Sequence, residues 1–440
     1  MPVTRRGPHA PCELDLASLP PSISVAHVCD SLRVCGTRNP GYGARDALTM
    51  KQLCRKHPPL ALLSRAAILI GLVAAPVAAR ALDLVTLVDG SRRVHVDGEV
   101  LLTAADGGLL VQGRDGRMWT VEPEHLVAHR RDDEPFAPLS AEELVGRIRE
   151  ELSGDFDVFT TGHYVIVHNT SRSYAQWCGS LFERLYMAFT NYWRRQGFEL
   201  VEPRFPLVAL VFADAASYRA HAAAELGESA PYIVGYYSLQ SNRITTYDLT
   251  GLESLRRRDG PRTTAAQVNA LLSQPAAEQM VATLIHEATH QIAFNCGLHQ
   301  RYADIPLWVS EGLAVYFETP DLSSRTGWRT IGAVNHARLD RFRDYLRRRP
   351  DDSLRTLLAD DARMRDPQTA IDAYAEAWAL NYFLLRQRSD PYLKYLSKLS
   401  AKTPLAWSEP AERLEEFRAA LGTDLEQLDE DFLRFISRLR

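Results

Sequence analysis

Two histidines and a glutamate in residues 286–290 form the strongest chemical pattern in the chain. The pentapeptide is His286-Glu287-Ala-Thr-His290, which has the H-E-x-x-H spacing. On a helix, residues four apart lie on the same face, so both imidazoles can reach one metal ion while Glu287 stands beside it as a general base. Apolar residues recur at helical spacing through residues 280–293, which predicts the buried helix that the motif requires. The pattern therefore predicts a zinc site with its own base.

Glu311 is the expected third ligand. A catalytic zinc ion usually takes three protein ligands, and the segment from Pro306 to Glu318 reads as a second helix that carries Glu311 and Glu318 on one face. Gly312 and Ala314 are small enough to let this helix approach the first one closely. Glu318 could accept the free N–H of a ligating imidazole, or it could be an ordinary solvated carboxylate.

The segments HEATHQIAFNCGL and PLWVSEGLAVYFE together resemble the gluzincin metallopeptidases, whose third ligand is a glutamate on the next helix. The closer resemblance is to an uncharacterised family of secreted bacterial proteins regarded as peptidases. It covers residues 164–399, with its strong motifs in residues 286–318. The resemblance implies that Glu287 activates a water molecule and that three residues bind Zn²⁺, namely His286, His290 and Glu311. No G-x-M-E-N stretch lies upstream, so the resemblance does not extend to aminopeptidase specificity.

Tyr374 is the expected donor to the oxyanion that forms during hydrolysis. It lies in the helical segment of residues 373–380, which resembles the later gluzincin helix whose tyrosine hydroxyl has this role. The alternative is that Tyr374 only packs against Trp378 in an amphipathic helix.

Residues 234–247 read as two short strands around a Gln-Ser-Asn turn. In metallopeptidases of this type the last strand before the metal helix is an edge strand that pairs with the substrate backbone, and edge pairing is a general way to hold an extended peptide. An ordinary hairpin within a mixed sheet is the alternative.

The first 81 residues predict export. From Met50, a basic stretch leads into an apolar run over residues 66–79 that ends in small residues, which is typical of a secretory signal peptide cleaved after Ala79 or Ala81. The run is too short to span a bilayer comfortably, so no permanent membrane span is expected. Residues 1–49 are rich in proline and arginine and have no sustained period, which favours a mis-assigned start with true initiation at Met50. The mature protein is expected in the periplasm or outside the cell.

Two cysteines remain after the predicted signal peptide, Cys178 and Cys296. A disulfide between them is favoured in an exported protein, and it would tie the zinc helix to the preceding long helix. Two buried free thiols are the alternative.

Beyond the signal peptide, the length permits about two folded units. Asp-Gly pairs separate short apolar stretches within residues 82–131, which predicts a small all-β module, and residues 132–138 read as a linker. Strands and amphipathic helices follow in residues 138–400. The expected fold is therefore α+β, with a gluzincin-like main domain and a C-terminal helical extension over residues 401–440.

Charge gives little indication of a nucleic-acid partner. The formal net charge of −4 provides no long-range attraction to nucleic acid. The arginines between Arg338 and Arg349 alternate with apolar residues, as on the solvent-facing side of an amphipathic helix.

The leading expectation is thus an exported zinc metallopeptidase acting on a peptide or protein substrate. One alternative is a binding or scaffold protein of the cell envelope that keeps the zinc fold, and another is a zinc hydrolase of a non-peptide amide. The intact Glu287 favours an enzyme, because a structural zinc site needs no base beside its first ligand. The sequence does not specify the oligomeric state.

Overall fold

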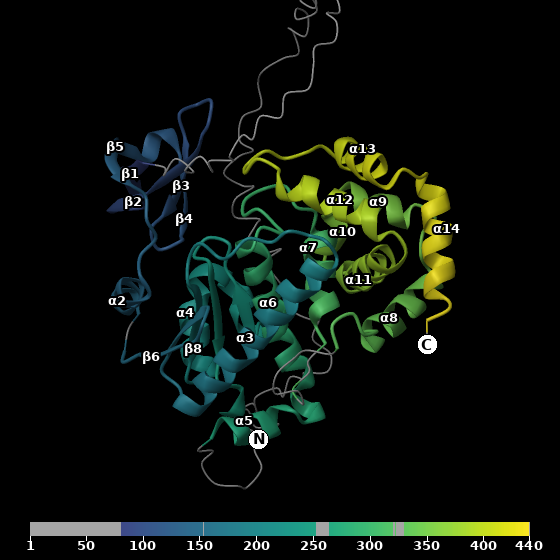
Figure 1. The fold of residues 1–440 in the computed structure, drawn as a ribbon, viewed down its shortest axis with the longest axis horizontal. Helices are drawn as coiled ribbons and strands as arrows, with labels where there is room; N and C mark the ends of the chain where they lie inside the picture. The colour runs from purple at the N-terminus through teal and green to yellow at the C-terminus, as the bar shows by residue number, and fades with distance from the viewer. Residues whose placement is uncertain (1–80, 153, 252–263, 320–321, 323–329, 440) are drawn as a thin grey trace, which may run out of the picture.

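The computed structural model describes residues 81–152, 154–251, 264–319, 322 and 330–439 (Figure 1). Residues 1–49 and the signal peptide expected from Met50 lie outside the described residues, except Ala81, the second of the two expected cleavage positions, which is the first residue of β1. The fold is α+β, with β-sheets in the N-terminal part and helices in the C-terminal part, as the sequence predicted. Within the described ranges, no helix combines the length and the apolar character needed to cross a membrane.

The first sheet is the small β-module expected from the Asp-Gly pairs. It has five antiparallel strands in the order β4-β3-β2-β1-β5. These are β1 (Ala81–Asp89), β2 (Arg92–Thr103), β3 (Leu109–Gly113), β4 (Met118–Val121) and β5 (Leu126–Pro135). Gly90, Gly107 and Gly116 take positive φ angles at its turns, whereas the remaining pair lies inside β2. Because β5 continues to Pro135, it includes residues that were expected to form a linker.

The second sheet supports the metal helix. Its order is β6-β7-β8-β10-β9, with the three central strands parallel and both edge strands antiparallel to their neighbours. The strands are β6 (Asp157–Thr160), β7 (Tyr164–His168), β8 (Leu207–Phe212), β9 (Gly235–Tyr237) and β10 (Arg243–Tyr247). The hairpin is present in a mixed sheet, which was the second of the two expectations, and its edge strand is β9. The last strand before the metal helix, β10, lies inside the sheet between β8 and β9, so the prediction that this last strand is the edge was wrong.

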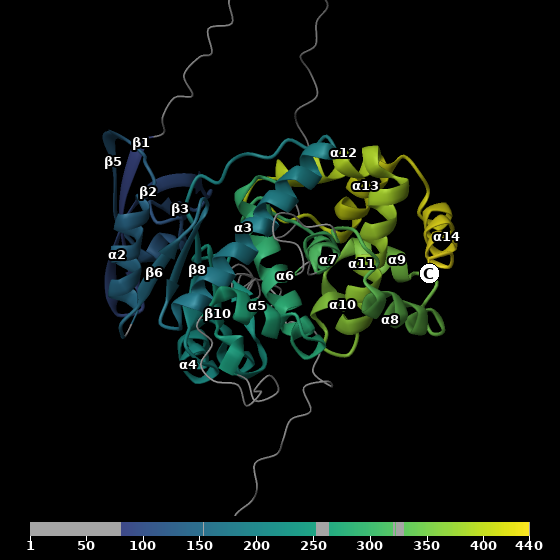
Figure 2. The ribbon, with the colours of Figure 1, turned by 60° about the horizontal axis from the view of Figure 1, so that its bottom comes forward.

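Helices pack on the second sheet and continue beyond it (Figure 2). Around the sheet lie α2 (Ala141–Glu151), α3 (Arg172–Arg195), α4 (Ala215–Leu226), α5 (Ala265–Leu272) and α6 (Glu278–Asn295). The helical part contains α7 (Leu307–Phe317), α8 (His336–Leu346), α9 (Ser353–Ala359), α10 (Ala362–Arg365), α11 (Ala370–Gln387), α12 (Ser389–Ser400), α13 (Pro410–Leu421) and α14 (Leu425–Ile436). α6 packs against β9 and β10 on one side and against α7 on the other, while α11 covers α7.

One hydrophobic core runs through most of the described chain. It includes Leu110 and Met118 of the β-module, and it includes Phe417 and Phe432 of the last two helices. The β-module has a second, smaller core of its own around Val85 and Val111. Residues 401–439 therefore pack into the same core as the helices that carry the expected metal ligands.

Cys178 and Cys296 are free, buried thiols, so the expected disulfide is not formed. Cys178 lies beside Tyr174 near the start of α3, whereas Cys296, at the end of α6, lies beside Tyr186. Tyr174 and Tyr186 are about 18 Å apart along α3, because a helix rises about 1.5 Å per residue. A disulfide needs Cα atoms within about 7 Å of each other.

The arginine run is not uniformly solvent-facing, and the prediction was wrong for Arg338 and Arg349. Arg338 is buried at the start of α8, and the Arg349 guanidinium is buried between Glu376 (2.8 Å) and Asp429 (2.6 Å). Arg347 is exposed, as expected. A local alternation of arginines with apolar residues does not reveal carboxylates that other helices bring to the same face.

Candidate metal centre

The helix α6 carries His286, Glu287 and His290 through the middle of the core. Every residue from Val281 to Ala293 is buried, so this helix is enclosed by protein on all sides. A buried polar side chain is costly unless it has a partner. The histidines and the glutamate must therefore find their partners within the protein or in a bound ion.

Glu311 on α7 meets both histidines. The Nε2 atom of His286 lies 3.1 Å from Oε2 of Glu311, and Nε2 of His290 lies 3.4 Å from Oε1 of the same carboxylate. The two Nε2 atoms are 3.1 Å apart. All three side chains are buried, and one ligand atom from each lies within 4.8 Å of the other two.

This triad could hold a metal ion. Two neutral imidazole nitrogens placed 3.1 Å apart repel each other unless a proton or a cation lies between their lone pairs. Two imidazoles and one carboxylate are a donor set that zinc takes in catalytic sites, where a further position stays open. The chemistry of the residues therefore fits zinc, while the geometry alone does not fix the identity of the ion.

A close contact between α7 and α11 sets the position of Glu311. A Cβ atom added to Gly312 would lie 2.2 Å from Nδ2 of Asn381 and 2.7 Å from the carbonyl oxygen of Ala377. The same Asn381 amide donates to the carbonyl of Trp308 on α7 (2.8 Å). Gly312 was expected to let α7 approach α6, and this was wrong, because its open side faces α11.

Glu318 lies directly behind the first histidine. Its Oε1 atom is 2.9 Å from Nδ1 of His286, and its Oε2 atom is 3.7 Å from the guanidinium of Arg338. Glu318 is buried, which excludes the alternative of an ordinary solvated carboxylate. A carboxylate that accepts Nδ1–H holds the imidazole in the tautomer whose Nε2 lone pair is free for a metal.

The protonation of the centre follows from these contacts. Burial acts to lower the pKa of His286, but Glu311 and Glu318 outweigh it and raise this pKa to about 10. Burial acts to raise the pKa of Glu311, yet the two imidazoles hold it well below its usual range. The pKa of His290 is lowered by burial. A site that keeps a proton among imidazoles and carboxylates at neutral pH can exchange that proton for a divalent cation.

Glu287 is buried beside the triad with one oxygen engaged. Its Oε2 atom accepts the backbone N–H of Tyr237 on β9 at 2.8 Å. Its Oε1 atom is buried and has no hydrogen-bond partner among the described residues. Burial raises the pKa of Glu287 to about 8, against the opposing effect of His286. A carboxylate in this state has one free acceptor and a proton affinity close to neutrality, which suits a general base.

Tyr374 on α11 lies close to the carboxylates of the centre. Burial raises its pKa well above the usual value for tyrosine, and the charge of Glu311 adds to this effect. The Arg338 guanidinium lies 6.0 Å from the centre of the Tyr374 ring. The hydroxyl therefore stays protonated and can donate. Trp378, the residue proposed as its packing partner, packs with Tyr382 at 5.5 Å between ring centroids.

Sequence reasoning missed several groups around the centre. The Tyr237 N–H has no sequence signature, because every residue except proline carries one. Arg338 was assigned to solvent. Gln291 and Asn295, which continue α6 beyond the motif, donate hydrogen bonds to the β9–β10 hairpin and to β8. The available signal was the pair of amides that continues the predicted buried helix beyond the motif, since buried amides need partners.

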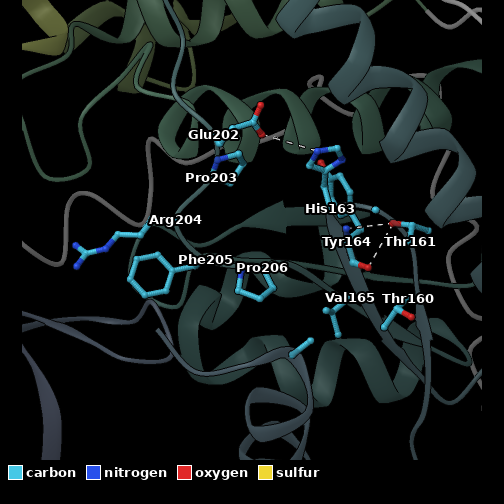
Figure 3. A pocket seen from close by; sticks show the side chains of 12 residues that line it. Thr160, Thr161, His163, Tyr164, Val165, Glu202, Pro203, Arg204, Phe205 and Pro206 are labelled. Carbon is cyan, nitrogen blue, oxygen red and sulfur yellow. Dashed lines mark hydrogen bonds and ion pairs between the residues drawn. The ribbon is translucent and has the colours of Figure 1, made fainter. Parts of the chain in front are cut away.

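A separate pocket of about 350 Å³ is shown in Figure 3. It is lined by Thr160, His163, Glu202, Arg204 and Phe205, among others, and none of its lining residues belongs to the metal centre. His163 is held there by Glu183, with Nδ1 2.9 Å from Oε2, and stacks on Tyr186 at 3.8 Å between ring centroids. These contacts join the residue that precedes β7 to α3 and account for the position of the histidine.

Comparison with known proteins places the metal centre inside a recognised family region. No curated protein matches the chain. Residues 280–406 match the model of the family described as "Protein of unknown function (DUF1570)". The matched range contains the triad together with Glu287, Glu318 and Tyr374, whereas both sheets lie outside it. Over residues 280–406 the chain is thus similar to the DUF1570 family, and this region carries a buried His286, His290 and Glu311 triad that could hold a metal ion.

Proposed function

We propose that this chain is an exported zinc-dependent metallopeptidase that hydrolyses peptide bonds. The arrangement of Glu287 carries the proposal. One of its oxygens is held by Tyr237, and the other is buried beside the triad without a hydrogen-bond partner among the described residues. A site that held a metal ion only for structure would gain nothing from a base in this position.

The residues around the triad divide the chemistry among them. The triad would hold the zinc ion, which when bound would supply Lewis acidity at the scissile carbonyl. Glu287 takes the proton of the attacking water at its free oxygen and can pass it to the leaving amine. Tyr374 donates its hydroxyl to the developing oxyanion. Glu318 keeps Nδ1 of His286 protonated, so that Nε2 faces the centre of the triad.

The substrate and the location are part of the same proposal. β9 is an edge strand next to Glu287, and an extended peptide can pair with such an edge. The signal-peptide pattern of residues 50–81 supports export to the periplasm or the medium.

Replacement of Glu287 tests the proposal. Glu287→Gln keeps the size of the side chain and an acceptor for Tyr237 but removes the base. We expect stoichiometric zinc by elemental analysis, and hydrolysis of a mixed peptide library that is lower by about 10² or more than in the wild type. The double variant His286→Ala, His290→Ala is the control that loses zinc.

Two results would contradict this function. If the wild type at full zinc occupancy cleaves no library peptide, or if Glu287→Gln leaves cleavage unchanged, a zinc-fold binding or scaffold protein takes the place of the peptidase. Cleavage of non-peptide amides alone would identify the site as that of a different zinc hydrolase.

A further inference from the structure

The turn of the β9–β10 hairpin is fixed to the metal helix by a buried hydrogen-bond network. Tyr237 donates its hydroxyl to Oδ1 of Asn242 (2.7 Å), and Asn242 donates its amide to Asn295 on α6 (2.9 Å). Gln291, the residue after the second histidine, donates to the backbone carbonyl of Asn242 (2.9 Å). Asn242 itself has a φ of 62°, a conformation that asparagine tolerates better than most residues. The helix thus holds the inner side of the turn.

The β-module holds the outer side of the same turn. The backbone N–H of Met118, at the start of β4, donates to the carbonyl of Gln240 at 2.8 Å. Arg301, in the loop between α6 and α7, donates from one guanidinium nitrogen to two carbonyls: Gly116 of the β-module at 2.9 Å and Leu239 of the hairpin at 3.2 Å. Arg301 therefore connects the module, the hairpin and the loop that follows the metal helix.

Burial makes the position of Arg301 energetically demanding. The residue is 6% exposed, and burial lowers the pKa of its guanidinium. Taking a guanidinium out of water costs several kcal/mol unless its N–H groups find good acceptors. Here two of the acceptors are carbonyls at turns of different sheets, so the arginine is satisfied only while the two turns keep their relative position.

The strand controlled by this turn faces the expected base. Ser238 donates to Arg243 across the hairpin, and in an antiparallel pair bonded and non-bonded positions alternate. Tyr237 and Gly235 consequently turn their backbone groups away from β10. The N–H of Tyr237 points to Glu287, so a shift of the hairpin would move both the edge available to a peptide and the contact that orients the base.

We propose that the N-terminal β-module is a positioning part of the metal centre: through Arg301 and Met118 it fixes the hairpin turn, and thereby holds edge strand β9 in register for an extended peptide. The choice of an extended peptide rests on the proposed peptidase function, whereas the positioning of β9 does not. Arg301 is accordingly a positioning residue, and the module is neither a spacer nor an independent docking domain.

Replacement of Arg301 tests this proposal in two independent ways. Arg301→Met keeps the aliphatic length and removes the donors, and Arg301→Lys restores a cation with fewer directed N–H groups. The matched control is Arg114→Met, which removes another module arginine that donates to a backbone carbonyl, that of Ala137 (2.8 Å), without touching the hairpin. Hydrogen exchange read by mass spectrometry follows residues 235–247, with α12 to α14 as the internal reference.

The second readout is the kinetics of peptides of different length. For Arg301→Met we expect KM to rise about tenfold for a peptide that is long enough to pair with β9. A tenfold rise corresponds to the loss of about one hydrogen bond between the peptide and the strand. The KM for a dipeptide amide, which is too short to pair with β9, should stay within about twofold of the wild-type value. Zinc content should be unchanged, and Arg301→Lys should recover part of the loss.

The outcomes separate this inference from the proposed function. Faster exchange confined to residues 235–247 in Arg301→Met, absent in Arg114→Met, supports the positioning role even if no peptide is cleaved. Unchanged exchange in the hairpin overturns it, whatever the activity. Faster exchange with an unchanged KM for long peptides overturns the pairing of substrate with β9. If Arg301→Met does not fold, hydrogen exchange in residues 235–247 is compared between Arg301→Lys and Arg114→Met instead.

Discussion

At the metal centre, three carboxylates and two imidazoles are packed where almost no solvent reaches them. Glu287, Glu311 and Glu318 would repel one another strongly at this burial if nothing compensated their charge. Arg338 compensates part of this charge through Glu318, and the proton on His286 compensates a further part; a divalent cation at the triad would replace that proton. The residues around the triad would therefore affect its affinity for a metal ion.

Glu318→Gln tests that contribution. The substitution leaves an acceptor behind His286 but removes the negative charge that makes the imidazole a better ligand. We expect zinc affinity, measured by competition with a chelator, to fall by about 10- to 100-fold. Glu278→Gln, the same change at the exposed start of α6, should leave the affinity unchanged. Equal affinities of the two variants would show that Glu318 does not tune the ligand.

Tyr374→Phe separates oxyanion stabilisation from packing. The change removes one hydroxyl and keeps the ring in place against Arg338. We expect kcat to fall by about 10² while KM changes little, because the hydrogen bond is needed only when charge develops on the oxygen. Zinc content and thermal stability serve as controls. A kcat equal to that of the wild type would assign Tyr374 to packing alone.

At the scale of elements, the position of Glu311 depends on how closely α7 and α11 approach. Gly312→Ala places a methyl group against Asn381 and the backbone of Ala377, which is overpacking between two buried helices. We expect a loss of about 1–3 kcal/mol in the free energy of unfolding, measured with denaturant. Gly146→Ala in α2 is the control, because an added Cβ there meets nothing within 4 Å. That change should stabilise the protein by about 0.5–1 kcal/mol, as alanine does for glycine in a helix.

The comparison of Gly312→Ala with Gly146→Ala also shows which result would disprove the prediction. If Gly312→Ala is neutral, the helices can separate at no cost and their contact does not fix Glu311. Zinc affinity measured on Gly312→Ala then shows whether the ligand has moved with the helix.

Sequence reasoning reached the ligands but not the contacts that hold them. The i, i+4 spacing places His286 and His290 on one face of any helix, and the helix that follows can present Glu311, so the triad is encoded locally. The role of Gly312 depends on Asn381, and that of Arg338 depends on Glu318. Unlike the i, i+4 histidines, these pairs follow no spacing rule along the chain, so the sequence alone does not indicate them. The edge strand was assigned to β10 for the same reason: strand order in a sheet is a long-range property, and an antiparallel hairpin can place either of its strands outside.

At the scale of the molecule, a buried ion cluster joins distant parts of the chain. Arg413 on α13 contacts Asp304 and lies 2.9 Å from Asp361, and Lys402 lies 3.2 Å from Asp304. Burial acts to raise the pKa of Asp304, but Arg413 and Lys402 outweigh it and hold this pKa below its usual value. Ionised Asp304 thus favours the folded state. Its contribution is fully present above the unfolded pKa of about 3.9 and is lost as the pH falls through the lower folded value.

Asp304→Asn should therefore cost most near neutral pH. We expect the free energy of unfolding to fall by about 1–3 kcal/mol at pH 7, because the buried Arg413 then keeps Asp361 as a carboxylate partner but loses its charged hydrogen bonds to Asp304. The difference in the free energy of unfolding between the wild type and Asp304→Asn should become smaller as the pH falls below about 4. Urea titrations of chelator-treated protein at several pH values measure this difference. Asp390→Asn, a substitution at an exposed residue, is the control. A difference that does not depend on pH would contradict the proposed link between the ionisation of Asp304 and the stability of the fold.

The cluster around Arg413 also has a consequence for the order in which the protein matures. Asp361, which Arg413 holds, accepts the N–H of Leu307, the first residue of the helix that carries Glu311 (3.0 Å). A ribosome or a translocation channel delivers the chain from its N-terminal end, so the motif of α6 emerges long before α13. Asp361, which contacts the start of the helix that carries Glu311, meets Arg413 only once α13 has docked. In the proposed peptidase, a nascent chain would therefore lack these contacts until α13 has docked, which would delay the onset of hydrolysis.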